Sequence, residues 1–184
     1  MEYKGATIQT IKEILPIDGC DNIELAKVLG WQCIVKKGEF KSGDRCVYIE
    51  IDSLLPIKPE YEFLRKSCHK KLTDGTEWFK IKTIKMKGQL SQGLVLSMDT
   101  LPPGSCVYRT DNDKVNIIGG DVSKLLGVVH YEKPAPTHGD ALGDFPNFIT
   151  KTDEVRVQSY PELLTSLHGK PYYITTKLDG TSAT

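Results

Sequence analysis

The chain lacks an excess of either charge, since 24 lysines and arginines balance 24 aspartates and glutamates among its 184 residues. Net charge alone therefore excludes no class of partner. The chain also lacks any apolar run near the roughly 20 residues that a membrane-spanning helix needs. Its first residues, Met1-Glu-Tyr-Lys-Gly, contain no apolar signal region. These absences predict a protein without a membrane partner.

Paired cysteines are missing too. The five cysteines form an odd set with no CxxC pair, and their spacing is typical of neither a zinc site nor a disulfide framework. They are Cys20, Cys33, Cys46, Cys68 and Cys106. We expect reduced thiols, which predict a cytoplasmic or otherwise intracellular protein, and we expect no metal site made by the protein alone.

Alternating apolar residues in the first half of the chain predict short antiparallel strands separated by turns. In the segment 46–51, Val47, Ile49 and Ile51 share one face, which is typical of a half-buried strand. The expected strands are 6–17, 23–31, 32–37, 46–51, 78–86 and 93–98. Strands of this kind within about 100 residues predict a mainly β fold with a small barrel of the OB type.

Positive charge concentrates in the stretch 65–87, where eight basic and two acidic residues give a net charge of +6. A bulge near Thr83 would bring four lysines of the predicted strand onto one face. They are Lys80, Lys82, Lys85 and Lys87. OB folds bind nucleic acid through cationic grooves and aromatic rings, and Trp78 and Phe79 adjoin these lysines. The four lysines are candidate RNA contacts; the alternative is a solvated edge strand whose lysines prevent aggregation.

The second half of the chain predicts a domain boundary. The segment 121–127 resembles one short helix that ends at a glycine. Proline and glycine then become frequent in 132–143, which is typical of a linker. We expect an OB domain at 1–128, a linker at 129–146 and the start of a second domain at 147–184.

Within that second segment, Ser159 and Glu162 match a capping box, and Gly169 is expected to end the helix that follows. The β-rich run 171–176 then predicts a strand whose end carries Lys177.

Lys177 begins the sequence Lys-Leu-Asp-Gly-Thr-Ser, which has the form KxDGxx. A covalent nucleotidyltransferase needs a lysine that attacks the α-phosphorus of ATP, and burial or nearby cations favour the neutral amine for that attack. Gly180 would let the backbone turn closely past the nucleotide, and Asp179 could orient neighbouring groups or a metal-bound water. The alternative is a surface turn in which Asp-Gly closes a hairpin.

The residues around this motif resemble one known family. The segment Lys151-Thr-Asp-Glu-x-Arg-x-Gln158, which precedes the lysine, is more specific than KxDG alone. Together with 23–31 and Gly88-Gln-Leu-Ser-Gln-Gly93, it resembles ATP-dependent RNA ligases that carry an OB domain before the nucleotidyltransferase domain. Ser182 stands where DNA ligases and capping enzymes usually have arginine, which favours the RNA ligases. The N-terminal half is also weakly similar to tRNA-binding OB modules.

The resemblance implies a three-step reaction: lysine takes AMP from ATP, AMP moves to an RNA 5′-phosphate, and a 3′-OH seals the strand. By resemblance Lys177 is the nucleophile, the Thr176 backbone contacts adenine, and Asp179 and Gly180 complete the motif. Arg156 would hold the triphosphate through its planar guanidinium; its alternative is an ion pair with Asp153 or Glu154. ATP and Mg²⁺ or Mn²⁺ are the implied cofactors.

Nicked duplex or broken RNA is the implied partner, and the protein is expected to be a monomer. The later motifs of the family follow the position where this chain ends, so we expect an inactive fragment of an RNA repair enzyme. That fragment would hold an OB domain plus the first helix and strand of an α+β nucleotidyltransferase domain. The alternative is an RNA-binding or tRNA-binding OB module without catalysis.

Overall fold

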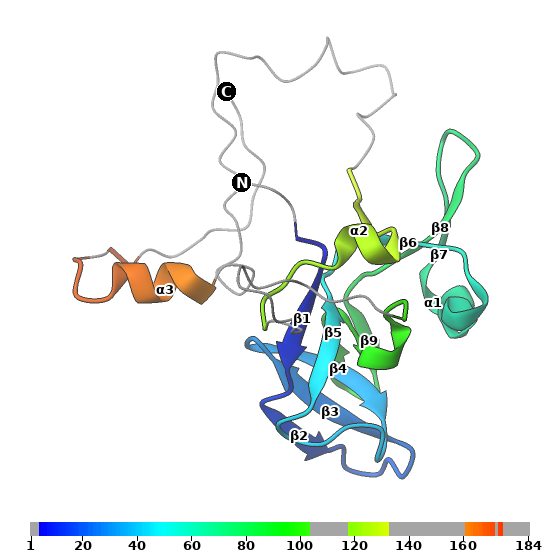
Figure 1. The fold of residues 1–184 in the computed structure, drawn as a ribbon. Helices are drawn as coiled ribbons and strands as arrows, with labels where there is room; N and C mark the ends of the chain where they lie inside the picture. The colour runs from blue at the N-terminus through cyan, green and yellow to red at the C-terminus, as the bar shows by residue number, and fades with distance from the viewer. Residues whose placement is uncertain (1–3, 104–117, 133–160, 172, 175–184) are drawn as a thin grey trace, which may run out of the picture. The chain divides into compact units, whose positions relative to one another are not determined.

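The computed structural model describes residues 4–103, 118–132, 161–171 and 173–174. Its contacts divide the chain into a first unit, 1–153, and a second unit, 154–184. The described strands all belong to the first unit (Figure 1).

The first unit is built from short strands joined by tight turns. The strands are β1 (Ala6–Thr10), β2 (Glu13–Pro16), β3 (Ile23–Val28), β4 (Trp31–Lys36), β5 (Arg45–Ile49), β6 (Ser53–Pro56), β7 (His69–Lys71), β8 (Glu77–Lys80), β9 (Ile84–Met86), β10 (Gln89–Ser91), β11 (Leu94–Ser97) and β12 (Val129–His130). Short helical turns connect them: η1 (Pro59–Leu64), α1 (Arg65–Cys68), η2 (Met98–Thr100) and α2 (Ser123–Leu126). The predicted mainly β fold is confirmed.

The strands hydrogen-bond in four sheets, of orders β1-β5-β11, β2-β3-β4, β12-β6-β8-β7 and β10-β9. None of these sheets closes on itself among the described residues, so the expected closed barrel is not seen. The contact between β4 and β10 explains why the sheets do not close. There the Ile34 N–H donates to the Ser91 hydroxyl (3.0 Å), and the Gln32 side chain donates to the Leu90 carbonyl (2.8 Å). Side chains thus replace part of a backbone ladder at this contact.

β5 is the central strand, and its two faces contact two different cores. Val47 and Ile49 lie in a first core with Ile8 and Phe79, whereas Cys46 and Tyr48 lie in a second core with Cys33, Val35, Phe40 and Val95. All four β5 residues are at most 1% exposed. The prediction of a half-buried strand here is therefore wrong, because the residues between the apolar positions face a second core instead of water.

Two segments predicted as single strands are each divided between sheets. In 6–17, the Ile11 N–H donates to Asp44, but the next N–H, of Lys12, donates to Lys27 in β3. The chain therefore changes sheets between these two residues. In 78–86, Ile81 still pairs with the Ser53 carbonyl, and the chain then enters the separate β9–β10 hairpin. The bulge expected near Thr83 is wrong, because a change of sheet takes its place.

The predicted helix at 121–127 is confirmed as α2. It ends at Gly127, whose φ of 73° lies in the left-handed region that glycine adopts without strain. Asp121 and Ser123 hold its start, since the Ser123 N–H and hydroxyl both donate to the Asp121 carboxylate (2.8 and 2.6 Å). The Ser123 hydroxyl also accepts from the Ala6 N–H (3.0 Å), which ties this turn to β1.

In the second unit, the predicted helix is α3 (Pro161–Leu167), followed by Gly169 at a positive φ of 77°. The strand expected at 171–176 is not present at Pro171, Tyr173 or Ile174, and the other positions of that run lie outside the described residues. A strand needs a hydrogen-bonded neighbour, and none of the described residues pairs with these three. Tyr173 and Ile174 are 98% and 86% exposed.

The four described cysteines are free thiols, whereas Cys106 lies outside the described residues. Burial raises the pKa of Cys33 to about 12, with a further contribution from Cys46, and burial also raises the pKa of Cys46 to about 12, helped by Asp44. A thiol reacts as its thiolate, so both groups should be inert near neutral pH.

Iodoacetamide at pH 8 should therefore label the partly exposed Cys20 about 1000-fold faster than Cys33 or Cys46 in the folded chain, because thiolate is nearly absent at the two buried sites. Peptide mass spectrometry would identify each labelled site, and chain unfolded in urea provides the control in which all sites react. Equal rates in the folded chain would contradict the burial of Cys33 and Cys46 in the second core.

Candidate nucleic-acid interface

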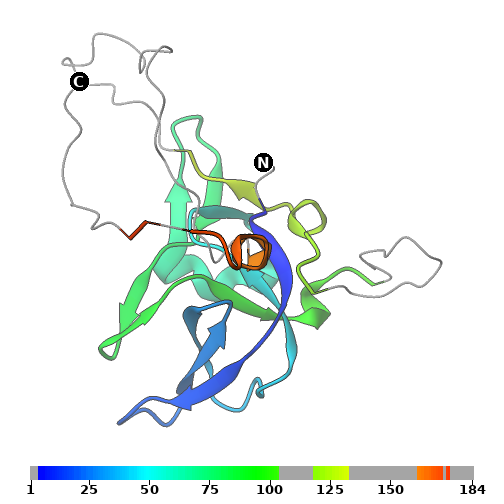
Figure 2. The ribbon, with the colours of Figure 1, turned by 90° about the vertical axis from the view of Figure 1, so that its left-hand side faces the viewer.

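The β9–β10 hairpin carries two exposed lysines, Lys85 and Lys87, that form no ion pair with any described residue. Its loop is the dipeptide Lys87-Gly88, with φ values of 51° and 79°. Positive φ at both central residues defines a type I′ turn, which matches the twist of a hairpin. This turn places Lys87 at the tip of the hairpin, which extends from the first unit (Figure 2, green).

The hairpin is anchored to β4 and β5 through its last residues. The carbonyl of Gln92 accepts from the Tyr48 hydroxyl (2.9 Å) and from the Cys33 thiol (3.6 Å), while the Gln92 N–H donates to the Gln32 carbonyl (2.8 Å). Tyr48 and Cys33 belong to the second core. The orientation of the hairpin is thus fixed by core residues as well as by its own ladder.

Gly93 completes this anchor because no larger residue fits. Its φ is +115°, and a Cβ at this position would lie 2.6 Å from the Tyr48 ring and 2.8 Å from the Ile49 carbonyl oxygen. Backbone and core ring both block the space. Gly75, at the β7–β8 loop, also has a positive φ (+85°) but has open space around it.

The substitution Gly93→Ala should lower the free energy of unfolding by about 2–4 kcal/mol, since backbone strain and a steric clash combine. Gly75→Ala is the matched control, with an expected loss of about 1 kcal/mol from backbone strain alone. Urea unfolding followed by circular dichroism measures both. Similar losses in the two variants would argue against the close packing of the hairpin on Tyr48.

The four predicted RNA-contact lysines fall into two groups. Lys82, Lys85 and Lys87 are exposed and form no ion pair with any residue in the described part of the chain. Lys80 differs, because its amine lies 3.2 Å from the Asp52 carboxylate and 3.8 Å from the centre of the Tyr131 ring. Its side chain is only 18% exposed. Lys80 therefore has internal partners, and the structure does not bring the four amines onto one strand face.

Among the described residues, two further ion pairs of the basic stretch lie at the surface. Arg65 donates two hydrogen bonds to the Glu62 carboxylate (2.6 and 2.7 Å), and these bonds lower the pKa of Glu62. His69 contacts Glu77 at 3.1 Å, and this hydrogen bond is the main cause of the lowered pKa of Glu77. Exposed pairs of this kind contribute little stability, but they reduce the charge available to an anionic ligand.

The two aromatic residues of β8 have opposite environments. Phe79 is fully buried in the first core, so it cannot receive a nucleobase. Trp78 is partly exposed and belongs to neither core. Its indole N–H donates to the Thr76 hydroxyl (3.0 Å), which in turn donates to the Asp74 carboxylate (2.7 Å). The sequence pattern does not predict this chain of hydrogen bonds, although Asp74-Gly75 is a recognisable turn signal.

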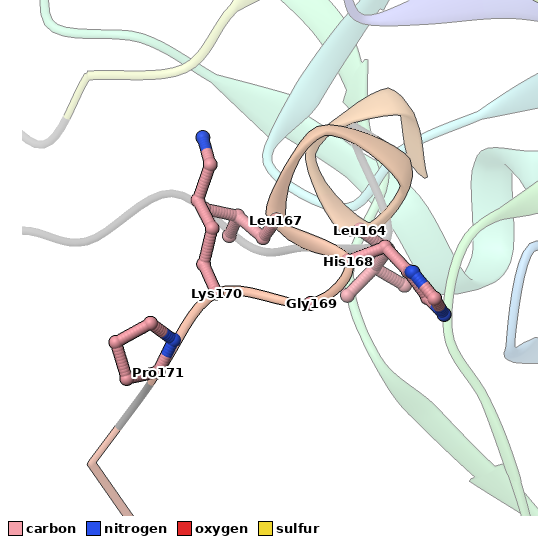
Figure 3. Close-up of a pocket in the computed structure, with 6 residues that line it drawn as sticks. All are labelled: Leu164, Leu167, His168, Gly169, Lys170 and Pro171. Carbon is pink, nitrogen blue, oxygen red and sulfur yellow. The ribbon is translucent and has the colours of Figure 1, made fainter.

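The predicted catalytic residues lie outside the described residues. They are Arg156, Thr176, Lys177, Asp179 and Gly180. Nearby in sequence, the end of α3 and the turn after it border a hollow of about 380 Å³ (Figure 3). Its lining is Leu164, Leu167, His168, Gly169, Lys170 and Pro171. This largely apolar lining offers packing surface rather than groups for nucleotide chemistry.

Metal-binding clusters and membrane-spanning helices are both absent from the described residues. In the described ranges, no cluster of three or more histidine, cysteine or acidic side chains could hold a metal ion. Among the same residues, no helix is long and apolar enough to cross a membrane.

Comparison with known families identifies the first unit. A family model described as an OB-fold domain matches residues 5–98, just over half of the chain, from the start of β1 to the end of β11. The chain therefore belongs to this OB-fold domain family. No curated protein sequence matches the chain.

Solved structures give a more particular similarity. Naegleria gruberi RNA ligase with pyrophosphate is 42% identical, over 88% of this chain and 46% of that chain, with a TM-score of 0.67. A variant of the ligase with AMP and Mn is 41% identical over 91% and 47%, with a TM-score of 0.69. Another variant with ATP and Mn is 41% identical over 91% and 48%, with a TM-score of 0.68. The chain thus spans about half the length of these ligases.

Proposed function

We propose that this chain is the N-terminal part of an ATP-dependent RNA ligase, which joins a 3′-OH to a 5′-phosphate through a lysyl-AMP intermediate. The observation that carries the proposal is the 41–42% identity to RNA ligase structures over about nine-tenths of this chain. That similarity extends beyond the OB-fold domain at 5–98, so it includes part of the region after it.

In this proposal the OB domain occupies 1–128, a linker occupies 129–146 and the nucleotidyltransferase domain begins at 147–184. Lys177 is the nucleophile: its neutral amine attacks the α-phosphorus of ATP, an N–P bond forms and pyrophosphate leaves. Arg156 holds the triphosphate, Thr176 contacts adenine through its backbone, and Asp179 and Gly180 shape the turn after the nucleophile. ATP with Mg²⁺ or Mn²⁺ would supply the nucleotide and neutralise phosphate charge.

Lys82, just before the β9–β10 hairpin, and Lys85 and Lys87 within it would contact phosphates of the RNA substrate, a nicked duplex or a broken strand. Lys82, Lys85 and Lys87 support this role because they are exposed and have no ion pair among the described residues. Each phosphate contact releases counterions from RNA and so contributes affinity that decreases with salt. Lys80 would act indirectly, since its amine is held by Asp52 and Tyr131.

The test of the chemistry is covalent labelling. The full-length natural protein, incubated with α-labelled ATP and Mg²⁺ or Mn²⁺, should acquire a label on protein that survives denaturation. Lys177→Ala should abolish the label, because no other amine replaces the nucleophile. Lys170→Ala, at an exposed lysine of the second unit, is the matched control and should label normally.

Label that persists in Lys177→Ala would sink the assignment of the nucleophile. A protein that never labels, yet binds RNA, would instead support the second candidate, an RNA-binding OB module without catalysis. The OB-fold domain, which alone spans just over half of the chain, favours that alternative.

The test of the interface is charge reversal. Replacing Lys82, Lys85 and Lys87 together by glutamate should weaken RNA binding about 10- to 100-fold at moderate salt, because phosphate contacts are lost. The salt slope, which is the slope of log affinity against log salt concentration, should decrease in magnitude by about 2. Lysine adenylylation should be unchanged. Lys80 is left intact in this variant, since Lys80→Glu would place a carboxylate beside Asp52 and disturb the fold.

Reversal of Lys36, Lys37 and Lys41, three exposed lysines elsewhere in the first unit, is the matched control for the change in net charge. Fluorescence anisotropy with a nicked RNA duplex measures both variants across a range of salt concentrations. Equal weakening by the two sets would show a general charge effect and remove the hairpin from the interface.

A further inference from the structure

The β7–β8 hairpin presents an aromatic ring that belongs to neither core. Trp78 is partly exposed, whereas its neighbour Phe79 fills the first core. In the sheet register Trp78 lies opposite Pro56 on one side and Lys70 on the other. Large aromatic side chains usually bury their area in a core. A tryptophan outside both cores calls for another explanation.

The ring is also held in place from its polar end. Asp74 accepts from the Thr76 N–H (2.9 Å) and hydroxyl (2.7 Å), and the Thr76 hydroxyl accepts from the Trp78 indole (3.0 Å). The loop is closed by the Leu72 N–H, which donates to the Thr76 carbonyl (2.9 Å). The indole has used its one donor, so what remains for a ligand is the π face.

Lys70 supplies a cation next to the ring. Lys70, directly opposite Trp78, forms no ion pair in the described part of the chain, and its amine lies 4.5 Å from the centre of the Tyr131 ring. Lys71 beside it is exposed. A flat π surface next to cations fits a nucleotide, whose base can stack while its phosphate meets the amine.

We propose that Trp78 is a stacking platform for an unpaired nucleobase of the RNA, with Lys70 contacting the adjoining phosphate. The proposal rests on the proposed RNA-binding function and adds a second contact region, on the β7–β8 hairpin, separate from the lysines of β9–β10. Stacking accepts any base, because each has a π face, so this contact favours single-stranded or frayed RNA without reading its sequence.

The experiment compares two probes on the 184-residue chain: a single-stranded oligouridylate and an abasic ribose-phosphate strand of equal length. Trp78→Leu should weaken oligouridylate binding about 10- to 100-fold. It should leave the abasic strand and the salt slope unchanged, because stacking releases no counterions. Trp78→Phe should retain most of the affinity. Lys70→Gln should weaken both probes equally and lower the salt slope by about 0.7.

Thr76→Val tests the positioning of the ring. It keeps the shape of the side chain but removes the hydroxyl that accepts from the indole, so oligouridylate binding should fall by an amount smaller than in Trp78→Leu. Thr73→Val, in the same loop, is the control; Thr73 is exposed and has no hydrogen bond among the described residues. An unchanged thermal midpoint in each variant verifies that the fold is intact.

Two results would overturn the stacking role of Trp78. One is a Trp78→Leu variant that binds oligouridylate as tightly as the unaltered chain does. The other is an equal loss of affinity for both probes. If the lysine reversal in β9–β10 weakens binding while Trp78→Leu does not, the platform fails and the RNA-binding interface stands. If that reversal has no effect, the hairpin part of the proposed function fails, whatever Trp78 does.

Discussion

The arrangement of the first unit depends on β5, a strand with a core on each face. Val47 and Ile49 on one face and Cys46 and Tyr48 on the other are shielded from water. Such double burial removes apolar area from water on both sides of a single backbone, at about 25 cal/mol per Å². β1 and β11 pair with β5 and complete its sheet.

The geometry of the candidate interface depends on β5. Tyr48 reaches out of the second core to the Gln92 carbonyl, and Gly93 passes so close to the Tyr48 ring that a side chain is excluded. The other hairpin is placed by Phe79, whose burial in the first core turns Trp78 outward on the alternate position of β8. Two surfaces with different chemistry, one cationic and one aromatic, are therefore positioned by the two cores on either side of β5.

Local patterns predicted much of this fold. Alternation located most of the strands, and glycine located the ends of α2 and α3 at Gly127 and Gly169. The predictions that failed concern features that depend on residues far apart in the sequence. Alternation cannot distinguish a face in water from a face against a second core, so β5 was misjudged. The division at Ile81 follows from its pairing with Ser53, and the internal role of Lys80 follows from Asp52 and Tyr131. The exposed Lys82, Lys85 and Lys87 were predictable as surface charge, whereas the catalytic residues and domain boundaries stay predictions.

The anchor at Gln92 has a consequence for the thermodynamics of recognition. A loop that orders only when its ligand arrives loses about 1–2 kcal/mol of backbone entropy per residue at that moment. The β9–β10 hairpin loses this freedom during folding instead, because its turn is two residues long. In addition, the Gln92 carbonyl that follows β10 accepts hydrogen bonds from Tyr48 and Cys33. An anion that reaches Lys85 or Lys87 meets an ordered backbone, so only the motion of the lysine side chains remains to be restricted.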